Sequence, residues 1–292
     1  MQPSSSLELP ANLVAATQED GVAARWDWLE RLPTVVASVA AGWDLQVGRP
    51  YQPGGQTAWV APARGSDGAD LVLKVGWRHP EAEYEAHGLR LWAGSGAVLL
   101  HRSLSRGDTS ALLLERCLPG HDLETEPVPE QDRVIAGLLQ RLWVEPDELD
   151  ELPPLSQMCA AWADELESRP GSFLDPGQVR AGARLFRELP STATSRVLLA
   201  TDLHAGNVLA AERQPWLAID PKPYAGDPTY DLLQHLVNDP PRIAAAPREV
   251  TDRFAGLCGV DADRLRLWLF ARCVVEGARS AEMADLARLL AP

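Results

Sequence analysis

The sequence is short of cysteine and of positive charge. Its four cysteines (Cys117, Cys159, Cys258 and Cys273) are widely separated along 292 residues, which argues against a zinc site, a redox pair or a disulfide framework and predicts small core residues. Lysine and arginine number 27 against 41 acidic residues, so the net charge is −14. This charge disfavours nucleic acid and anionic membranes as partners, and it would suit a cationic small molecule.

Long apolar runs are also missing, because Arg, Asp or Glu interrupts each one before it reaches the length of a membrane span. Residues 1–20 lack the basic start and the apolar stretch of a signal peptide, so a cytoplasmic protein is expected. The length is sufficient for two lobes with separate cores. We expect no membrane or nucleic-acid partner and a monomer or weak dimer.

Two short apolar runs, each followed by a carboxylate, stand out between residues 197 and 231. Residues 197–199 lead to Asp202, and residues 216–219 lead to Asp220. Such runs predict buried strands, with the polar residues on the loops that follow them. Gly206 allows the first loop to turn tightly.

The spacing in this loop is typical of a kinase. Asn207 follows Asp202 by five residues, as the magnesium-binding Asn follows the base in a kinase catalytic loop. Phosphoryl transfer needs a carboxylate to accept the proton of the attacking hydroxyl, and oxygen ligands to hold Mg²⁺ against the phosphates. We therefore predict Asp202 as the base and Asn207 with Asp220 as the metal ligands. Asp and Asn are also common turn formers, so the spacing alone is a weak indication.

A lysine inside an apolar run strengthens the hypothesis. Lys74 lies within residues 70–76, where a buried ammonium needs a partner unless it lies on an edge strand and reaches water. A kinase has here the lysine that contacts the α- and β-phosphates and pairs with a Glu on the next helix. That helix is predicted over residues 80–92, which include Glu81 and Glu85.

Residues 198–231 resemble the catalytic core of the aminoglycoside phosphotransferase family, which has a protein-kinase-like fold. The runs Ile-Asp-Pro-Lys-Pro (219–223) and Gly-Asp-Pro-Thr-Tyr-Asp (226–231) are similar to its streptomycin 6-phosphotransferase and hydroxyurea phosphotransferase branch. The resemblance implies ATP or GTP as donor, Mg²⁺ as cofactor and a small-molecule hydroxyl as acceptor, such as streptomycin or hydroxyurea. It also implies a role in antibiotic resistance or secondary metabolism.

The resemblance assigns further residues. The setting Glu-Ala-x-x-Leu-Arg-Leu selects Glu85 as the partner of Lys74, with Glu81 as the alternative. Gly54 and Gly55 would cover the nucleotide phosphates or form only a hairpin turn. The remaining roles fall on four residues: Glu115 and Cys117 would offer backbone hydrogen bonds to adenine, Asp231 would anchor the catalytic loop, and Lys222 is either a phosphate contact or a solvated side chain.

The predicted fold class is α+β, with a lobe over residues 1–116 and a mostly helical lobe over residues 117–292. The first lobe begins with a helix over 10–41 that Pro33 kinks or divides, followed by a five-stranded antiparallel sheet. The strands are predicted at 45–51, 57–63, 70–76, 97–103 and 110–115, and the helices of the second lobe at 129–144, 155–167, 176–189, 228–237, 247–257 and 261–290, the last broken near Gly277.

One departure from the family pattern keeps an alternative open. The family usually has His-Gly before the catalytic Asp, and this chain has Ala200-Thr201. Ala200 has no side-chain donor, and the β-branched Thr201 is expected to exclude a positive φ. A weakened enzyme, which the double change Ala200→His with Thr201→Gly would accelerate, and a nucleotide-binding pseudokinase are both consistent with this.

A metal-dependent hydrolase built from Asp202, His204 and Asp220 is a further alternative, although it leaves Lys74 unexplained. In a kinase, His204 is expected to pack and hydrogen-bond within its loop. Contacts to the acceptor are not assigned. The candidates, each more typical of a surface charge or a packing residue, are Glu276, Asp239, His235 and Trp268.

Overall fold

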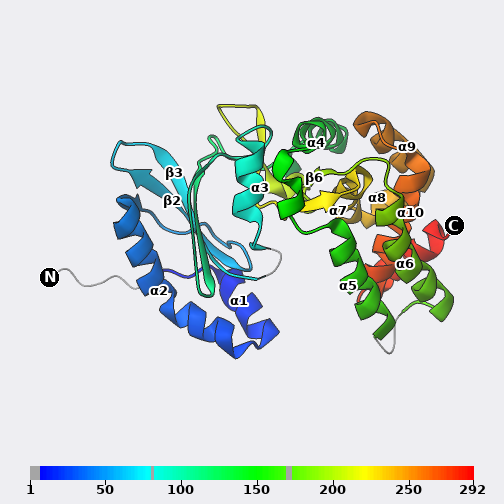
Figure 1. Cartoon of the computed structure of the whole chain (residues 1–292), viewed down its shortest axis with the longest axis horizontal. Helices are drawn as coiled ribbons and strands as arrows, with labels where there is room; N and C mark the ends of the chain where they lie inside the picture. Colours follow the sequence, from blue (N-terminus) through cyan, green and yellow to red (C-terminus); the bar gives the residue numbers. More distant parts are fainter. Residues whose placement is uncertain (1–6, 80–81, 169–172) are drawn as a thin grey trace. The chain divides into compact units, whose positions relative to one another are not determined.

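The structure, a computed structural model, describes residues 7–79, 82–168 and 173–292 (Figure 1). The chain forms two compact units. The N-terminal unit comprises Met1–Gly94 and Val98–Leu118, and the C-terminal unit comprises Ser95–Ala97 and Pro119–Pro292. In the described part of the chain, no helix combines the length and apolar character that a membrane span needs.

A five-stranded sheet forms the centre of the N-terminal unit and confirms the predicted one. Its order is β1-β2-β3-β5-β4, and every neighbouring pair is antiparallel. The strands are β1 (Leu45–Val47), β2 (Ala58–Gly65), β3 (Asp70–Trp77), β4 (Leu100–Arg106) and β5 (Thr109–Glu115). The fourth strand begins later than predicted because Ala97 forms a parallel bridge with Ala218 in the C-terminal unit instead.

Two helices precede the sheet, α1 (Ala11–Asp20) and α2 (Ala23–Trp43). The chain divides at Gly21, which has a φ of 64°, and Asp20 Oδ1 accepts a hydrogen bond from the Val22 N–H at 3.0 Å. Pro33, which was expected to kink or divide the helix, does not divide it, because α2 continues through this residue.

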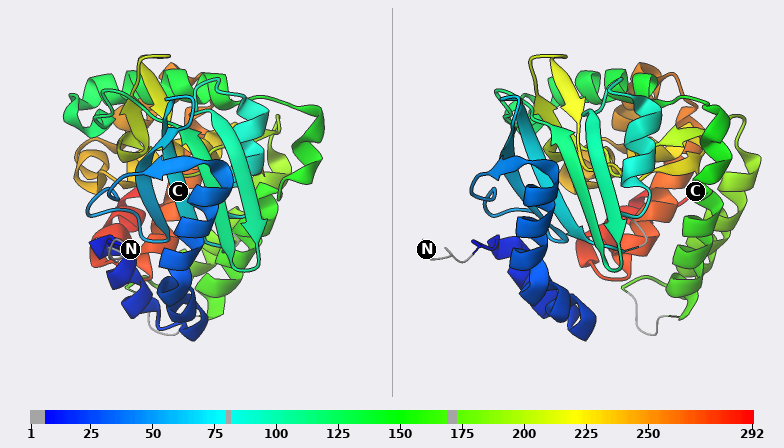
Figure 2. Two further views of the ribbon diagram at one scale, coloured as in Figure 1. Left: turned by 90° about the vertical axis from the view of Figure 1, so that its left-hand side faces the viewer. Right: turned by 60° about the vertical axis from the view of Figure 1, so that its left-hand side comes forward.

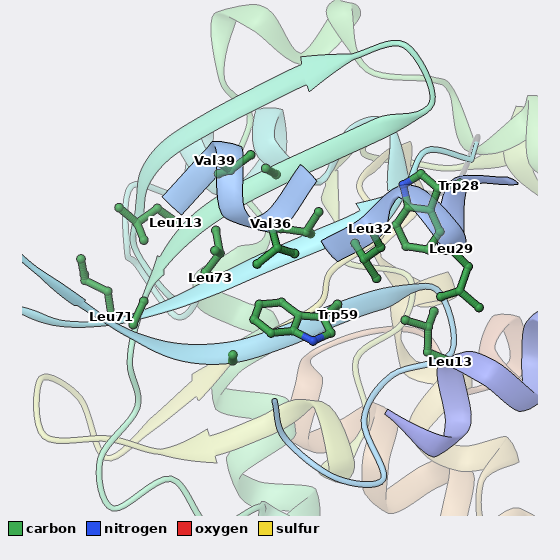
Figure 3. Close-up of a cluster of buried hydrophobic side chains, with 14 residues drawn as sticks. Leu13, Trp28, Leu29, Leu32, Val36, Val39, Trp59, Leu71, Leu73 and Leu113 are labelled. Atoms are coloured by element: carbon green, nitrogen blue, oxygen red, sulfur yellow. The ribbon is translucent and has the colours of Figure 1, made fainter. Parts of the chain in front are cut away.

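The helix α2 lies across one face of the sheet (Figure 2), and the core between them is apolar. Figure 3 shows Leu32 and Val36 of the helix directed towards Trp59 and Leu73 of the sheet. Full burial of each such side chain contributes about 1.5–3 kcal/mol. Because the two helices and the sheet share this core, the helices are an integral part of the N-terminal unit.

Strand alternation then decides where Lys74 lies. Leu71, Leu73 and Val75 belong to the core under α2, so Lys74 points to the opposite face. On that side lies α3 (Glu85–Trp92) (Figure 1). The start predicted for this helix, Pro80 and Glu81, lies outside the described residues.

The C-terminal unit is mostly helical, as predicted. Its α-helices are α4 (Val128–Leu142), α5 (Leu155–Ser168), α6 (Pro176–Glu188), α7 (Leu233–Val237), α8 (Pro240–Ala245), α9 (Pro247–Cys258), α10 (Ala262–Gly277) and α11 (Ala281–Leu290). The predicted break at Gly277 is confirmed, and a Cβ at this position would lie 2.9 Å from Ala284 Cα of the next helix. The sequence analysis missed α8, although Asp239 before two prolines is a helix-start signal.

All four cysteines are buried and none of them forms a disulfide within the described residues, which confirms the prediction of core residues. Burial raises the pKa of the Cys258 and Cys273 thiols to about 12, so both stay protonated at neutral pH.

Candidate active site

Two hairpins of the C-terminal unit position the predicted catalytic loop. β6 (Val197–Leu199) pairs with β9 (Tyr224–Gly226), and β7 (Val208–Ala210) pairs with β8 (Trp216–Ala218). The loop with Asp202 follows β6, and Asp220 follows β8. The Ile219 N–H donates to the Asn207 carbonyl oxygen at 2.9 Å, so the second hairpin brings the segment before Asp220 alongside Asn207.

The donor set suits Mg²⁺. Asn207 Nδ2 donates to the Asp202 carbonyl oxygen at 3.0 Å, so the hydrogen-bonded side of this amide is its NH₂ and its Oδ1 is the atom that can bind a metal. Asp220 is exposed and supplies a carboxylate. Two protein oxygens are sufficient, because Mg²⁺ keeps several waters and takes further ligands from substrate phosphates.

The hydrolase hypothesis needs a different arrangement. Within residues 7–79, 82–168 and 173–292, no three His, Cys, Asp or Glu side chains lie where they could hold a metal together. Asp202, His204 and Asp220 therefore do not form the protein-only metal site that this alternative requires.

Asp231 anchors the catalytic loop from the 3-10 turn η6 (Pro228–Leu232). It is fully buried and accepts hydrogen bonds from the N–H groups of Ala200 (3.0 Å) and Thr201 (2.6 Å) and from Trp143 Nε1 (3.1 Å). Burial raises the pKa of its carboxyl to about 6, against the opposing effect of these three donors. At neutral pH it is mostly ionised and fits the anchoring role that the family resemblance implied.

The backbone at Thr201 differs from the expectation. Its φ is +52°, the conformation that the sequence analysis expected a β-branched residue to exclude. Two contacts offset the strain: the N–H bond to Asp231, and a bond from Thr201 Oγ1 to the Lys222 carbonyl oxygen at 2.5 Å. Neighbouring Ala200 is 1% exposed, which leaves little space for a histidine. The loop is thus braced by Asp231 and the Thr201 hydroxyl.

Replacing Asp231 with Asn should loosen this brace. In the variant, the Asn NH₂ group faces N–H donors that share a carboxylate in the parent protein. Each buried N–H left without an acceptor costs about 1–3 kcal/mol. We expect the free energy of unfolding to fall by that amount, measured in urea. Asp263→Asn, which changes an exposed carboxylate of the same unit, should leave it unchanged. Equal stabilities of parent and Asp231→Asn would contradict the anchoring role.

Lys222 contacts the predicted base directly. Its Nζ lies 3.1 Å from Asp202 Oδ2, and its N–H donates to the Ala200 carbonyl oxygen at 2.9 Å. The sequence pattern left the role of Lys222 open, but the composition contains an indication of it. The chain has 25 arginines and only two lysines, Lys74 and Lys222, and each forms an ion pair with a carboxylate predicted to belong to the site.

The His204 side chain forms a hydrogen bond within its own loop. Its Nδ1 accepts a hydrogen bond from the Gly206 N–H at 3.2 Å, as expected for a packing residue. Burial lowers the pKa of the imidazole, while the carboxylates of Asp202, Glu124 and Asp220 oppose that effect. Three carboxylates therefore act on this one ring.

The residues predicted to bind nucleotide lie in the N-terminal unit. Lys74 Nζ lies 2.8 and 2.7 Å from the two carboxylate oxygens of Glu85, and the two side chains are 13% and 4% exposed. The pairing that was expected is therefore present. The N–H of Glu115 donates to the Leu99 carbonyl oxygen at 2.9 Å, so a bond from Glu115 to adenine would use its carbonyl group. Cys117, the other predicted hinge contact, is buried.

The four candidate acceptor contacts all have structural partners. Trp268 is fully buried and donates to Asp227 at 2.7 Å, and His235 is buried at 3.0 Å from Asp132. Hydrogen bonds from His235, Arg242 and Arg253 overcome burial and lower the pKa of Asp132 to about 2. Asp239 caps α8 through the Arg242 N–H, and Glu276 pairs with Arg272 at 2.9 Å.

The five-stranded antiparallel sheet and the mostly helical second unit define the class of this protein, which has a protein-kinase-like fold. The macrolide 2'-phosphotransferase MphH from Brachybacterium faecium matches with a TM-score of 0.57 at 17% identity, over 90% of this chain and 98% of that one. The amicoumacin kinase hAmiN, solved with AMP-PNP and Ca²⁺, matches with a TM-score of 0.54 at 14% identity, over 84% of this chain and 86% of that one. At these identities the likeness shows the fold alone.

Sequence comparison gives the family. The profile of the aminoglycoside/hydroxyurea antibiotic resistance kinases matches residues 44–284, and the chain belongs to this family. It is 38% identical to a hydroxyurea phosphotransferase of Kitasatospora aureofaciens, over 92% of this chain and 78% of the relative. It is 35% identical to a streptomycin 6-kinase of Streptomyces griseus, over 93% of this chain and 90% of the relative.

Proposed function

We propose that this chain transfers the γ-phosphoryl group of ATP or GTP to a hydroxyl group of an aminoglycoside such as streptomycin. The observation that carries the proposal is the catalytic loop, in which Asn207 is bonded to the Asp202 backbone at 3.0 Å and Lys222 lies 3.1 Å from the Asp202 carboxylate. The base and one metal ligand thus lie on one braced loop, and the ammonium of Lys222, from the segment that follows β8, lies against the base.

The residues divide the chemistry between them. Asp202 orients the acceptor hydroxyl and accepts its proton. Asn207 and Asp220 hold Mg²⁺, which when bound neutralises phosphate charge. Lys74, held by Glu85, contacts the α- and β-phosphates, and Glu115 and Cys117 offer backbone groups to the base of the nucleotide. In this proposal residues 1–116 form the nucleotide-binding lobe, to which Cys117 adds one backbone contact, and residues 117–292 carry the catalytic loop and the acceptor site.

The charge around the loop favours a cationic acceptor. Asp202, Glu124 and Asp220 all act on His204, and a Cβ at Gly206 would lie 2.8 Å from Glu124 Oε1. With a net charge of −14, this field attracts an aminoglycoside more strongly than a neutral molecule. Hydroxyurea is the second candidate, because the relative at 38% identity is a hydroxyurea phosphotransferase.

Lys222 has a defined task in this mechanism. Its ammonium holds the Asp202 carboxylate in position and presents positive charge where the phosphoryl group is transferred. The use of lysine at this position, in a chain with 25 arginines and only one other lysine, is consistent with a site that needs a compact ammonium rather than a planar guanidinium.

Replacing Lys222 with Ala should therefore lower kcat by about tenfold to a hundredfold, the range expected for one charged hydrogen bond. The dissociation constant for the nucleotide should change little. Lys222→Arg should restore only part of the rate. Arg196→Ala breaks an exposed ion pair with Asp150 in the same unit and is the matched control, with the parent rate expected. If Lys222→Ala has the kcat of the parent, the alternative hypothesis is correct and Lys222 is only a solvated side chain.

The proposed function is tested by a panel of acceptors. Purified chain is incubated with ATP or GTP and Mg²⁺ and with streptomycin, other aminoglycosides or hydroxyurea, and the phosphorylated product is identified by mass spectrometry. Phosphorylation of streptomycin in preference to hydroxyurea supports the proposal, and the reverse preference selects the second candidate. Nucleotide binding without turnover on any acceptor would establish the pseudokinase instead.

A further inference from the structure

The loop with Gly54 and Gly55 is attached to the segment that precedes the sheet. Asn12 N–H donates to the Pro53 carbonyl oxygen at 3.0 Å, and Asn12 Nδ2 donates to the Gly54 carbonyl oxygen at 2.9 Å. Arg25 Nη2 donates to the Gln56 carbonyl oxygen. The carbonyl groups on both sides of the glycine pair are therefore held by α1 and α2.

Packing and side-chain bonds add to this attachment. A Cβ on Gly54 would lie 2.5 Å from Pro10 Cβ, so the loop backbone lies directly against the start of α1. The Gln52 side chain accepts from the Ala11 N–H at 3.2 Å and donates to Glu8 Oε1 at 3.2 Å. α1 itself is held to the sheet through Leu13, a fully buried member of the core in Figure 3.

The side chain of Arg25 is a buried part of this contact. It is 7% exposed, and its second terminal nitrogen pairs with Asp20 at the end of α1. The N–H of Val22, together with the guanidinium of Arg25, lowers the pKa of the Asp20 carboxyl against the opposing effect of burial, so the pair stays charged. One side chain thus connects α1, α2 and the loop.

The N–H groups of this loop differ from its carbonyl groups in their hydrogen bonding. Among the residues that the structure describes, none accepts a hydrogen bond from the N–H of Gly54, Gly55 or Gln56. Consecutive backbone N–H groups without a protein acceptor are suited to an anion such as phosphate. Gly55 and Gln56 are also exposed, so such an anion can reach them.

We propose that the segment Glu8–Arg25 holds this loop in the conformation that binds nucleotide phosphates, with Asn12 and Arg25 as its positioning residues. The proposal rests on the proposed function, in which a nucleotide is the donor. The segment lies before residue 44, where the match to the family profile begins. A loop that already has its binding conformation in the free protein loses less conformational freedom when phosphate binds. Its affinity for phosphate is therefore higher.

The test uses the full chain and two ligands. Equilibrium dialysis with labelled ATP and labelled adenosine is carried out on Asn12→Ala, Arg25→Met and the double variant. Asn12 is exposed, so its replacement leaves the core intact. We expect the Kd for ATP to rise about threefold in Asn12→Ala and about tenfold in the double variant, whereas the Kd for adenosine, which has no phosphates, stays at the parent value.

Two controls match the variants. Gln18→Ala removes an exposed side chain of the same helix α1, and Arg31→Met removes an exposed arginine of α2 that pairs with Asp108. Both should bind ATP as the parent does. An unchanged ATP affinity in Asn12→Ala and in the double variant overturns the proposal, and so does an equal loss for ATP and adenosine, which indicates general damage to the sheet. If the parent itself binds no ATP, the proposed function fails first.

Discussion

Replacing Asp202 with Asn is expected to lower kcat by about two to four orders of magnitude, the usual effect of removing a general base. The amide keeps the shape of the side chain and loses the oxygen that accepts the proton of the acceptor hydroxyl. Nucleotide binding should persist, because Asp202 is not among the residues assigned to the nucleotide or the metal. The backbone contact to Asn207 also survives, since it uses the Asp202 carbonyl group.

Kinetics and binding together distinguish catalysis from structure here. Steady-state turnover is measured with the acceptor found in the panel, and the nucleotide Kd is measured by calorimetry. Asp202→Glu, which retains the carboxylate on a longer side chain, should keep more activity than Asp202→Asn. A parallel loss of turnover and nucleotide affinity would point to a structural role for Asp202.

Replacing Asp220 with Ala is expected to remove the dependence of nucleotide affinity on Mg²⁺. The cation contributes several kcal/mol to the stabilisation of phosphate charge, so both MgATP affinity and kcat should fall by about a hundredfold or more. The fold should survive, because Asp220 is exposed. Its positive φ of 51° is a conformation that alanine adopts less readily, and Asp220→Asn keeps a side chain that tolerates it.

Calorimetric titration with ATP, in the presence and absence of Mg²⁺, measures this effect. Glu212→Ala is the matched control, because it removes an exposed carboxylate from the turn of the same β7–β8 hairpin. The control should retain the full magnesium effect. If Asp220→Ala and Asp220→Asn bind MgATP as tightly as the parent, Asp220 is not the metal ligand.

Much of the fold was predictable because local pattern specifies it. The apolar runs, the turn residues and the helical periodicity gave the five strands and most of the helices. The boundaries failed where a distant contact decided them. Ala97 was assigned to a strand but pairs with Ala218, which lies far along the chain. A second boundary failed for a local reason: Pro33 was expected to kink or divide a helix, yet the left-handed backbone of Gly21 ends the first helix instead.

The amino-acid sequence by itself determined which chemical groups this protein has and in which order they occur. Lys74 interrupts an apolar strand, Asp202 and Asn207 have the spacing of a kinase catalytic loop, and Asp220 follows the next apolar run. Only the tertiary structure decided that Lys222 lies 3.1 Å from Asp202 and that Asp231 and the Thr201 hydroxyl hold a threonine at positive φ. It also brought Asn12 to the loop at Gly54. These contacts join residues about 20 to 40 positions apart in the chain. Their geometry depends on how sheets and helices pack, which local spacing does not encode.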